Sequence, residues 1–367
     1  MISCSAFQSN GVGLDEKKIE VQTSSGVVSN DLGSLDLGFV SWQDIPFAQP
    51  PVGDLRWRAP RPLDSPSQII SPKDDTACVQ KASVYAGATG EGIVGSEDCL
   101  YLDITAPIDF KDKSYPVMFW IHGGGNTSGL KDYYDYSKLV STRDVVVVRT
   151  NYRLGALGWF THPSIQGEQE GIDKTSNFGT LDIIQSLKWV QTNISGFGGD
   201  PRNVTIFGES AGGHNVFALL ASPMADGLFH KAISQSGYTS SYSLEDAVNE
   251  NGTNRLIERG SSQIIDREFG SGVDRDLLRS ELKEMDARAF IGLYYQEEGI
   301  DSIPLTTRDD IVIPKIGLLE ALSRPEYAKN IPVMAGANKD EVSLWHGLHR
   351  YFIDVSYPLS KLLPPVI

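Results

Sequence analysis

The chain has 367 residues, enough for one large domain or two, and 40% of them are hydrophobic while 22% are charged. This composition is typical of a globular protein, and no apolar run approaches the length needed to span a bilayer. The formal net charge of −15 argues against nucleic acid or an anionic membrane surface as a partner.

Hydrophobic patterning predicts a strand-rich opening followed by alternating strands and helices. Such alternation favours an α/β fold with a mostly parallel sheet and helices on both faces. The more charged stretch 241–330 is expected to cap the edge of the sheet rather than form a separate domain. The expected elements are a hairpin of residues 18–23 and 26–29, strands at 117–121, 145–149, 231–236 and 331–336, and a helix marked by Leu181, Ile184, Leu187 and Val190.

The most informative segment is a strand, a tight turn and a helix around Ser210. Residues 204–207 have the pattern of a short buried strand, residues 214–221 that of a helix, and Gly208-Glu209-Ser210-Ala211-Gly212 between them matches G-x-S-x-G. In this context the motif predicts a nucleophile elbow, in which the serine sits at strained backbone angles. Its neighbours two positions away must then be small, so that strand and helix can pass closely. Ser210 is therefore the candidate nucleophile.

A second candidate element of an active site is Gly123-Gly124-Gly125, which follows a predicted strand ending at Ile121. Backbone N–H groups of glycines can point into a site because no Cβ obstructs them, and donors of this kind stabilise a developing oxyanion. Taken alone, the three glycines are equally well explained as a plain turn.

Five blocks of sequence, in order, resemble the type-B carboxylesterases, the cholinesterase-like branch of the α/β-hydrolases. The resemblance covers residues 17–345, with a mild departure at Thr105, where a larger apolar residue is usual. It implies an α/β-hydrolase fold in a domain of residues 17–367. Residues 1–16 are expected to be the remnant of an N-terminal leader. The blocks are the serine segment and residues 45–53, 97–104, 120–125 and 151–158.

This resemblance implies a serine carboxylic-ester hydrolase that works through an acyl-enzyme at Ser210. Gly124, Gly125 and Ala211 would donate the N–H groups of the oxyanion hole. His122 lies beside these glycines, and the family gives that position no general-base role, so we interpret it as structural. We expect no metal and no other cofactor, and the expected partner is a small-molecule ester.

The family's triad acid aligns with Glu341, and Asp340 is the alternative. Ser236 resembles a residue of the family whose hydroxyl holds the acid in place. The triad histidine is missing from its expected position, because none of the six histidines lies in an H-G-x-[ED]-like loop well beyond Glu341. His346 and His349 follow Glu341 too closely. We therefore expect the catalytic histidine to be absent from this chain, the sequence to be incomplete at its C-terminus, and the chain itself to be impaired.

Cys78 and Cys99 resemble the family's first disulfide, with two unpaired buried thiols as the alternative. A bridge would imply an oxidising compartment, hence a secreted or periplasmic protein. Cys4, within Met1-Ile2-Ser3-Cys4, resembles the end of a lipoprotein processing site, although the apolar segment that should precede it is absent.

Substrate identity is the least determined feature. Cholinesterases bind a quaternary ammonium through a tryptophan in the loop between these cysteines, and residues 79–98 contain none. A general carboxylic ester is therefore expected, while the oligomeric state stays open. Two alternatives remain: a non-catalytic adhesion relative of the neuroligin kind, which typically lacks the serine, and an inactive fragment.

Overall fold

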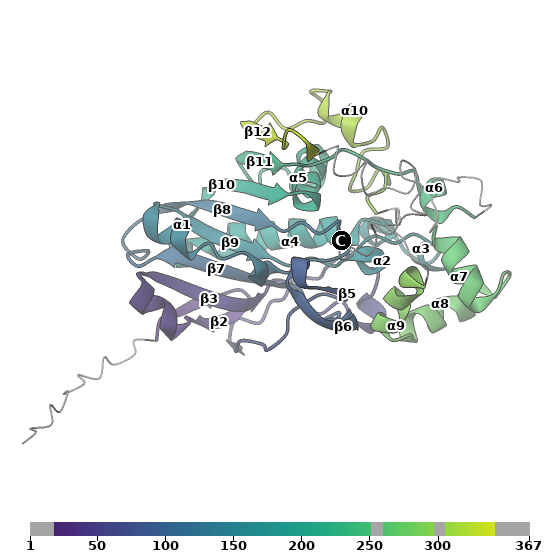
Figure 1. Ribbon diagram of the computed structural model, residues 1–367, viewed down its shortest axis with the longest axis horizontal. Helices are drawn as coiled ribbons and strands as arrows, with labels where there is room; N and C mark the ends of the chain where they lie inside the picture. The colour runs from purple at the N-terminus through teal and green to yellow at the C-terminus, as the bar shows by residue number, and fades with distance from the viewer. Residues whose placement is uncertain (1–17, 251–259, 297–304, 342–367) are drawn as a thin grey trace, which may run out of the picture.

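The computed structural model describes residues 18–250, 260–296 and 305–341 (Figure 1). Its centre is a seven-stranded sheet in the order β12-β11-β10-β8-β9-β7-β3. The first five strands in that order run parallel, whereas β7 and β3 are antiparallel to their neighbours, so the predicted mostly parallel sheet is confirmed. The strands are β3 (Phe39–Pro46), β7 (Tyr101–Pro107), β8 (Tyr115–Ile121), β9 (Val146–Thr150), β10 (Gly199–Glu209), β11 (Lys231–Gln235) and β12 (Val333–Gly336).

Helices cover both faces of this sheet (Figure 1). The long helix α4 (Phe178–Asn193) and the helix α5 (Ala211–Ala221) pack on one face, and α1 (Ser137–Thr142) lies on the other. The remaining α-helices are α2 (Gly155–Gly158), α3 (Pro163–Gln166), α6 (Leu244–Val248), α7 (Ser261–Phe269), α8 (Arg275–Glu284), α9 (Ala287–Gly292) and α10 (Leu318–Leu322).

Two small sheets flank the large one. The predicted hairpin is confirmed as β1 (Glu20–Thr23) and β2 (Gly26–Ser29), which are joined by the short β4 (Ile69–Ile70). A separate antiparallel pair, β5 (Gln80–Ser83) and β6 (Ala88–Val94), lies within the loop between Cys78 and Cys99.

The predicted cap is only partly confirmed. Helix α10 packs against α5, but α7, α8 and α9 lie beside α2 and α3, beyond the carboxyl ends of the strands rather than over the edge of the sheet (Figure 1). The reason is a second hydrophobic cluster, in which Ile264, Leu282 and Phe290 from these helices bury Trp57 and Phe160. A charged helical segment can thus have an apolar face of its own that determines where it packs.

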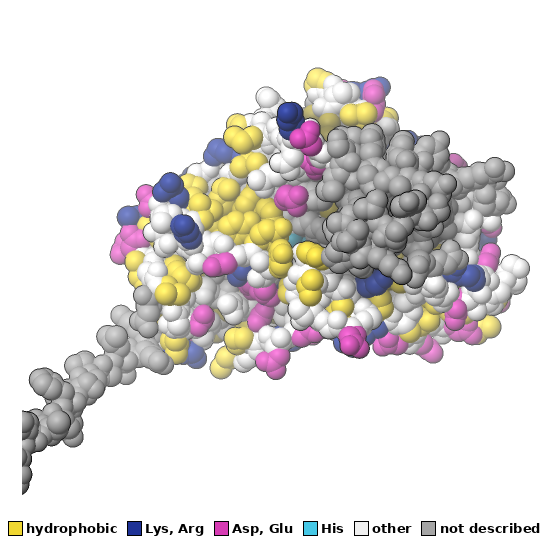
Figure 2. Space-filling model, in the orientation of Figure 1, with side chains coloured by type: hydrophobic (Ala, Val, Ile, Leu, Met, Phe, Trp, Pro, Cys, Tyr) yellow, Lys and Arg dark blue, Asp and Glu magenta, His cyan; other side chains and the backbone are white. Residues whose placement is uncertain are grey.

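A row of apolar side chains crosses four neighbouring strands on the sheet face that carries α1. Trp120, Phe207, Ile233 and Met334 are adjacent in register on β8, β10, β11 and β12. Tyr136 packs over the rings of Trp120 and Phe207, which are buried, whereas Met334 at the edge is 68% exposed. Figure 2 shows hydrophobic side chains gathered on this face. We call these four residues the apolar row.

Candidate active site

Ser210 occupies the turn between β10 and α5. Its backbone angles are φ 56° and ψ −119°, a left-handed conformation that side chains rarely adopt, so the predicted strain is confirmed. The turn is held by a 2.8 Å hydrogen bond from the Ser210 N–H to the carbonyl of Gln235. Within the described part of the chain, the Ser210 hydroxyl has no hydrogen-bond partner. Ser210 itself is half-buried.

The glycines around Ser210 are required by close backbone approach. A Cβ on Gly208 would lie 2.5 Å from the carbonyl carbon of Gly212, and a Cβ on Gly212 would overlap the carbonyl oxygen of Ile121. Helix α5 begins at Ala211, directly after the serine and three residues earlier than predicted. The early start follows from the tight turn, which leaves no linker between strand and helix.

Residues 123–129 form a loop after β8 that we call the glycine loop. A Cβ on Gly123 would lie 3.3 Å from the Cβ of Ser210, which places the loop beside the serine. The carbonyl of Gly124 accepts hydrogen bonds from the N–H groups of Thr127 (3.1 Å) and Ser128 (2.9 Å), closing a tight turn.

Three N–H groups near Ser210 are free of protein acceptors in the described residues. Those of Gly124 and Gly125 donate to no protein group, and these glycines have φ values of 98° and 64°. The N–H of Ala211 belongs to the first turn of α5, where intrahelical acceptors are lacking. These are the N–H groups that sequence analysis selected as oxyanion donors.

Glu341 is held at the carboxyl ends of β11 and β12. Its Oε2 accepts hydrogen bonds from the Ser236 hydroxyl (2.7 Å) and the Asn338 N–H (3.0 Å), so the expected contact with Ser236 is confirmed. Ser236 directly follows Gln235, whose carbonyl receives the Ser210 N–H. Consecutive residues therefore hold the serine turn and the carboxylate. The alternative acid, Asp340, is exposed.

A second carboxylate, that of Glu209, lies in the same region. Burial raises the pKa of Glu209, and the negative charge of Glu341 raises it further. Beside Glu209 is an open depression of about 480 Å³, which Ser236, Met334 and Asn338 also line. The carboxyl ends of β10, β11 and β12 therefore bound an open depression that has the Glu209 carboxyl at its margin.

The four described histidines have partners other than Ser210 and Glu341. His122 contacts the Gly123 carbonyl through Nδ1, and its ring stacks on Tyr152 at 4.3 Å. Burial lowers the pKa values of His122, His162 and His214 to about 4. His346 and His349 lie outside the described residues. The remaining partners are Ser164 for His162, Tyr238 and Thr306 for His214, and the Val204 N–H for His230.

Cys78 and Cys99 form a disulfide with their Cα atoms 5.0 Å apart, so the predicted bridge is confirmed and the unpaired thiols are excluded. Cys4 lies outside the described residues.

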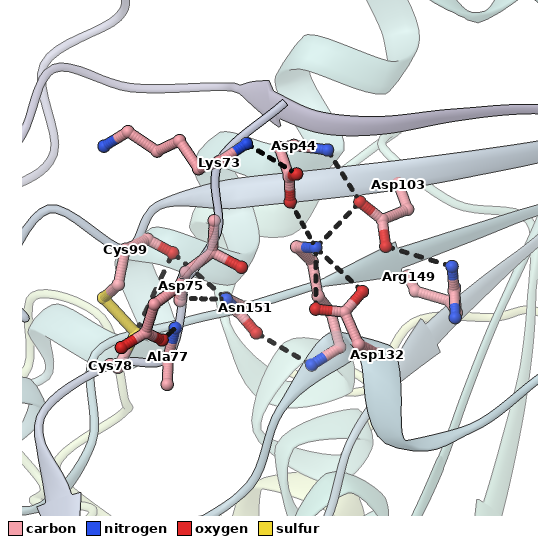
Figure 3. Close-up of polar contacts among 12 residues, drawn as sticks. Asp44, Lys73, Asp75, Ala77, Cys78, Cys99, Asp103, Asp132, Arg149 and Asn151 are labelled. Atoms are coloured by element: carbon pink, nitrogen blue, oxygen red, sulfur yellow. Dashed lines mark hydrogen bonds and ion pairs between the residues drawn. A yellow bond between two sulfur atoms is a disulfide. The ribbon is translucent and has the colours of Figure 1, made fainter. Parts of the chain in front are cut away.

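A buried lysine cluster, which the sequence analysis missed, lies next to this disulfide (Figure 3). The Lys131 ammonium is fully buried and contacts Asp44 (2.8 Å), Asp103 (2.9 Å) and Asp132 (2.9 Å). Arg149 adds a 3.0 Å ion pair to Asp103. Burial opposes the charge on Lys131, but the three carboxylates outweigh it and raise its pKa. Burial also raises the pKa of Asp103, against the effect of both cations.

Asn151 connects this cluster to the disulfide. Its Oδ1 accepts from the Lys131 N–H (2.9 Å), while its Nδ2 donates to the carbonyls of Thr76 (2.7 Å) and Cys99 (3.3 Å) (Figure 3). Lys131, which follows the glycine loop, is thereby linked through Asn151 to the backbone at Thr76 and Cys99.

The described residues include no group of three or more His, Cys, Asp or Glu side chains placed to hold a metal ion. None of the helices in these ranges is both long enough and apolar enough to cross a membrane.

A mostly parallel sheet that presents a serine at a tight strand–helix turn defines the α/β-hydrolase fold. Within this fold, the chain belongs to the carboxylesterase family, whose model matches residues 17–351.

Curated relatives of the chain include esterases from bacteria and mammals. It is 37% identical over 317 residues to the para-nitrobenzyl esterase of Bacillus subtilis, a match that covers 84% of this chain and 60% of that protein. It is 36% identical over 335 residues to the fumonisin B1 esterase of Sphingopyxis macrogoltabida, covering 89% and 57%. Liver carboxylesterase 1 of Oryctolagus cuniculus is 34% identical over 362 residues, covering 93% and 61%. The chain thus spans about 60% of the length of these relatives.

Solved structures show the same likeness. A thermophilic PNB esterase superimposes with a TM-score of 0.75 at 31% identity, covering 94% of this chain and 67% of that one. A carboxylesterase of Geobacillus stearothermophilus gives 0.73 at 30% identity, with 95% and 70% covered.

Proposed function

We propose that the chain is a serine carboxylic-ester hydrolase. The observation that carries this proposal is the arrangement around Ser210, whose hydroxyl lies at a strained turn beside the N–H groups of the glycine loop. Among the described residues, neither the hydroxyl nor the N–H groups of Gly124 and Gly125 have a hydrogen-bond partner. Ser210 Oγ would attack the ester carbonyl, and the resulting oxyanion would accept hydrogen bonds from the N–H groups of Gly124, Gly125 and Ala211. The ester C–O bond breaks, the leaving oxygen takes up the proton that the serine hydroxyl gives up, and the alcohol departs. Water then adds to the acyl-enzyme, so that the carboxylic acid is released and the Ser210 hydroxyl is restored.

Glu341 is the proposed triad acid, because it alone of the neighbouring Asp340–Glu341 pair is tied to Ser236. In a triad, the acid orients an imidazole that takes the serine proton. We propose that none of the six histidines in this chain fills that role. The four described rings are engaged elsewhere, and His346 and His349 follow Glu341 by only five and eight positions. A site with no base would keep about 10³–10⁴-fold of rate enhancement over water from binding and the oxyanion hole.

The proposed substrates are neutral carboxylic esters rather than choline esters. Residues 79–98 contain no tryptophan to bind a quaternary ammonium. The relatives support carboxylic esters in general, because they include a para-nitrobenzyl esterase and a liver carboxylesterase. The non-catalytic alternative is disfavoured because Ser210 and its strained turn are both present.

An acyl-transfer experiment tests this function. The chain is incubated with p-nitrophenyl butyrate, p-nitrophenol release is followed, and the butyryl adduct is located by mass spectrometry. We expect an adduct on Ser210 that is lost in Ser210→Ala and kept in Ser195→Ala, which changes an exposed serine away from the site. Release without an adduct on Ser210, or equal release by Ser210→Ala, would refute the proposal. Turnover at ordinary esterase rates that His346→Ala or His349→Ala abolished would refute the absence of a base.

We also propose that the protein is exported to an oxidising compartment, with Cys4 as a lipoprotein attachment site as one form of export. The disulfide supports export, because such bridges persist mainly outside the reducing cytosol. Fractionation of the cells that produce it, with thiol trapping of Cys78 and Cys99, tests the location. Recovery in the cytosol with both thiols reduced would contradict it.

A further inference from the structure

The glycine loop has no regular secondary structure, yet the proposed function requires its N–H groups to be fixed in direction before reaction. Donors that must first reorganise lose much of their effect on a developing oxyanion. The contacts that hold this loop are therefore part of the chemistry. Two side-chain amides, from segments far apart in the sequence, supply those contacts.

Gln80 holds the far end of the loop. Its Oε1 accepts the Gly129 N–H at 2.8 Å, and its Nε2 donates to the Gly129 carbonyl at 2.9 Å. The second Nε2 hydrogen is used as well, in a 3.0 Å bond to the Cys78 carbonyl. Gln80 is fully buried and begins β5, two positions after Cys78 and inside the loop that the disulfide closes. Its carboxamide thus pairs with both backbone groups of a single loop residue.

Gly129 also packs directly on His122. Its φ is 131°, and a Cβ there would overlap the His122 imidazole. The ring in turn contacts the Gly123 carbonyl through Nδ1 at 2.9 Å. Gln80 therefore holds Gly129, the last residue of the loop, against His122, the residue before the loop. The two ends of the loop thus lie together.

Asn215 holds the middle of the loop. Its Nδ2 donates to Asn126 Oδ1 at 2.8 Å, and Asn126 Nδ2 donates back to Asn215 Oδ1 at 3.4 Å. Both asparagines are fully buried, and Asn126 has a φ of 59°. Asn215 lies on α5, five positions after Ser210. This pair sets the loop relative to the helix that carries the serine.

We propose that Gln80 and Asn215 are positioning residues for the oxyanion hole, each acting through the glycine loop and neither touching substrate. The proposal rests on the proposed function. Without either amide, the N–H groups of Gly124 and Gly125 would no longer be held pointing toward the oxyanion. An interaction realised only in the transition state lowers kcat and leaves KM nearly unchanged. A small misplacement of catalytic groups is enough to cost about 10- to 100-fold in rate.

The variants are Gln80→Ala and Asn215→Ala, with Gln191→Ala as the matched control. Gln191 also donates from Nε2 to two backbone carbonyls, those of Pro201 (2.8 Å) and Leu228 (2.9 Å), but away from the glycine loop. Gln80→Glu serves as the conservative variant. Burial favours its protonated form, which keeps the acceptor for the Gly129 N–H but has one proton to donate to the two carbonyls that Gln80 Nε2 contacts.

Two measurements are made on the whole chain. Amide hydrogen exchange of peptides spanning residues 122–131 should be about tenfold faster in both alanine variants and unchanged in Gln191→Ala. For p-nitrophenyl butyrate, kcat should fall about 10- to 100-fold with KM within about twofold, and Gln80→Glu should lie between. Even a site without its base would report this effect, because its residual rate comes from the oxyanion hole and binding.

Unchanged exchange in the alanine variants would overturn the proposal, and so would faster exchange with an unchanged kcat. If Gln80→Ala fails to fold, Gln80→Glu and Asn215→Ala are tested against the same two criteria. If the parent chain forms no acyl adduct at Ser210, the proposed function fails and the positioning role fails with it. The exchange data would then still show whether the two amides hold the loop, so the two failures are distinguishable.

Discussion

The Ser236 hydroxyl donates a 2.7 Å hydrogen bond to Oε2 of Glu341 from a backbone with φ 53°. Two successive connections between β10, β11 and β12 therefore contain non-glycine residues in the left-handed region, since Ser210 has a φ of 56°. Strain of this kind costs about 1–3 kcal/mol per residue and persists only where surrounding structure enforces it.

Ser236→Gly removes the hydroxyl while tolerating this backbone angle. We expect amide hydrogen exchange across residues 336–341 to become about tenfold faster, because a hydrogen bond to a charged acceptor contributes about 1.5 kcal/mol or more. Thr192→Ala is the control, since the Thr192 hydroxyl only contacts the Lys188 carbonyl on the exposed side of α4. Equal exchange in Ser236→Gly and the parent chain would show that Ser236 does not support the acid.

Replacing the serine at the turn should separate stability from activity. We expect Ser210→Gly to be about 1 kcal/mol more stable than Ser210→Ala, because glycine adopts positive φ without strain. Urea denaturation followed by circular dichroism measures the difference, and neither variant should form the acyl adduct. Greater stability of the alanine variant would mean that the turn relaxes in solution.

The fold and the strained turn at Ser210 could be predicted from sequence because both have local signatures. Buried parallel strands are continuous apolar runs, and a tight turn around Ser210 requires Gly208 and Gly212 at fixed spacing. Glu341 has no such signature, and only the family resemblance selected it over Asp340. Gln80 and Lys131 were missed because their partners are distant in the chain, and nothing periodic marks such contacts.

Glu209 gives a pH-dependent prediction. Its pKa is raised above the ordinary value of 4.5, so the unfolded chain releases its proton before the folded chain does. Stability should therefore fall as pH rises from 4.5 through the higher folded pKa. Glu341→Gln removes one cause of the shift, so NMR titration of labelled glutamate carboxyls should show a lower pKa for Glu209. Asp340→Asn is the neighbouring control, and an equal effect from it would contradict the proximity of Glu341.

Lys131→Met should destabilise the protein by about 3–5 kcal/mol, because it leaves the buried Asp44 and Asp103 carboxylates without their shared cation. Lys138→Met, at an exposed position of α1, should change stability by less than about 0.5 kcal/mol. Guanidinium denaturation of both variants at pH 7 provides the comparison. A loss below about 1 kcal/mol at Lys131 would indicate that water reaches the cluster.

Replacing Cys78 and Cys99 by alanine should cost about 3 kcal/mol of stability, because the bridge closes a loop across a sequence separation of 21. The same loss should follow when the parent chain is unfolded in excess dithiothreitol. Agreement between the two experiments assigns the loss to this bridge, whereas a loss only in the double variant would point to a packing defect at the alanines.

The apolar row has a consequence for how the protein behaves at high concentration. Its side chains change from buried at Trp120 to largely exposed at Met334, and β12 pairs only with β11 among the described residues. An edge strand with free backbone groups and an apolar flank is a template for pairing with other chains. Sulfate and phosphate salts strengthen apolar association and should therefore promote self-association of the protein. Replacing Met334 with lysine should reduce this self-association.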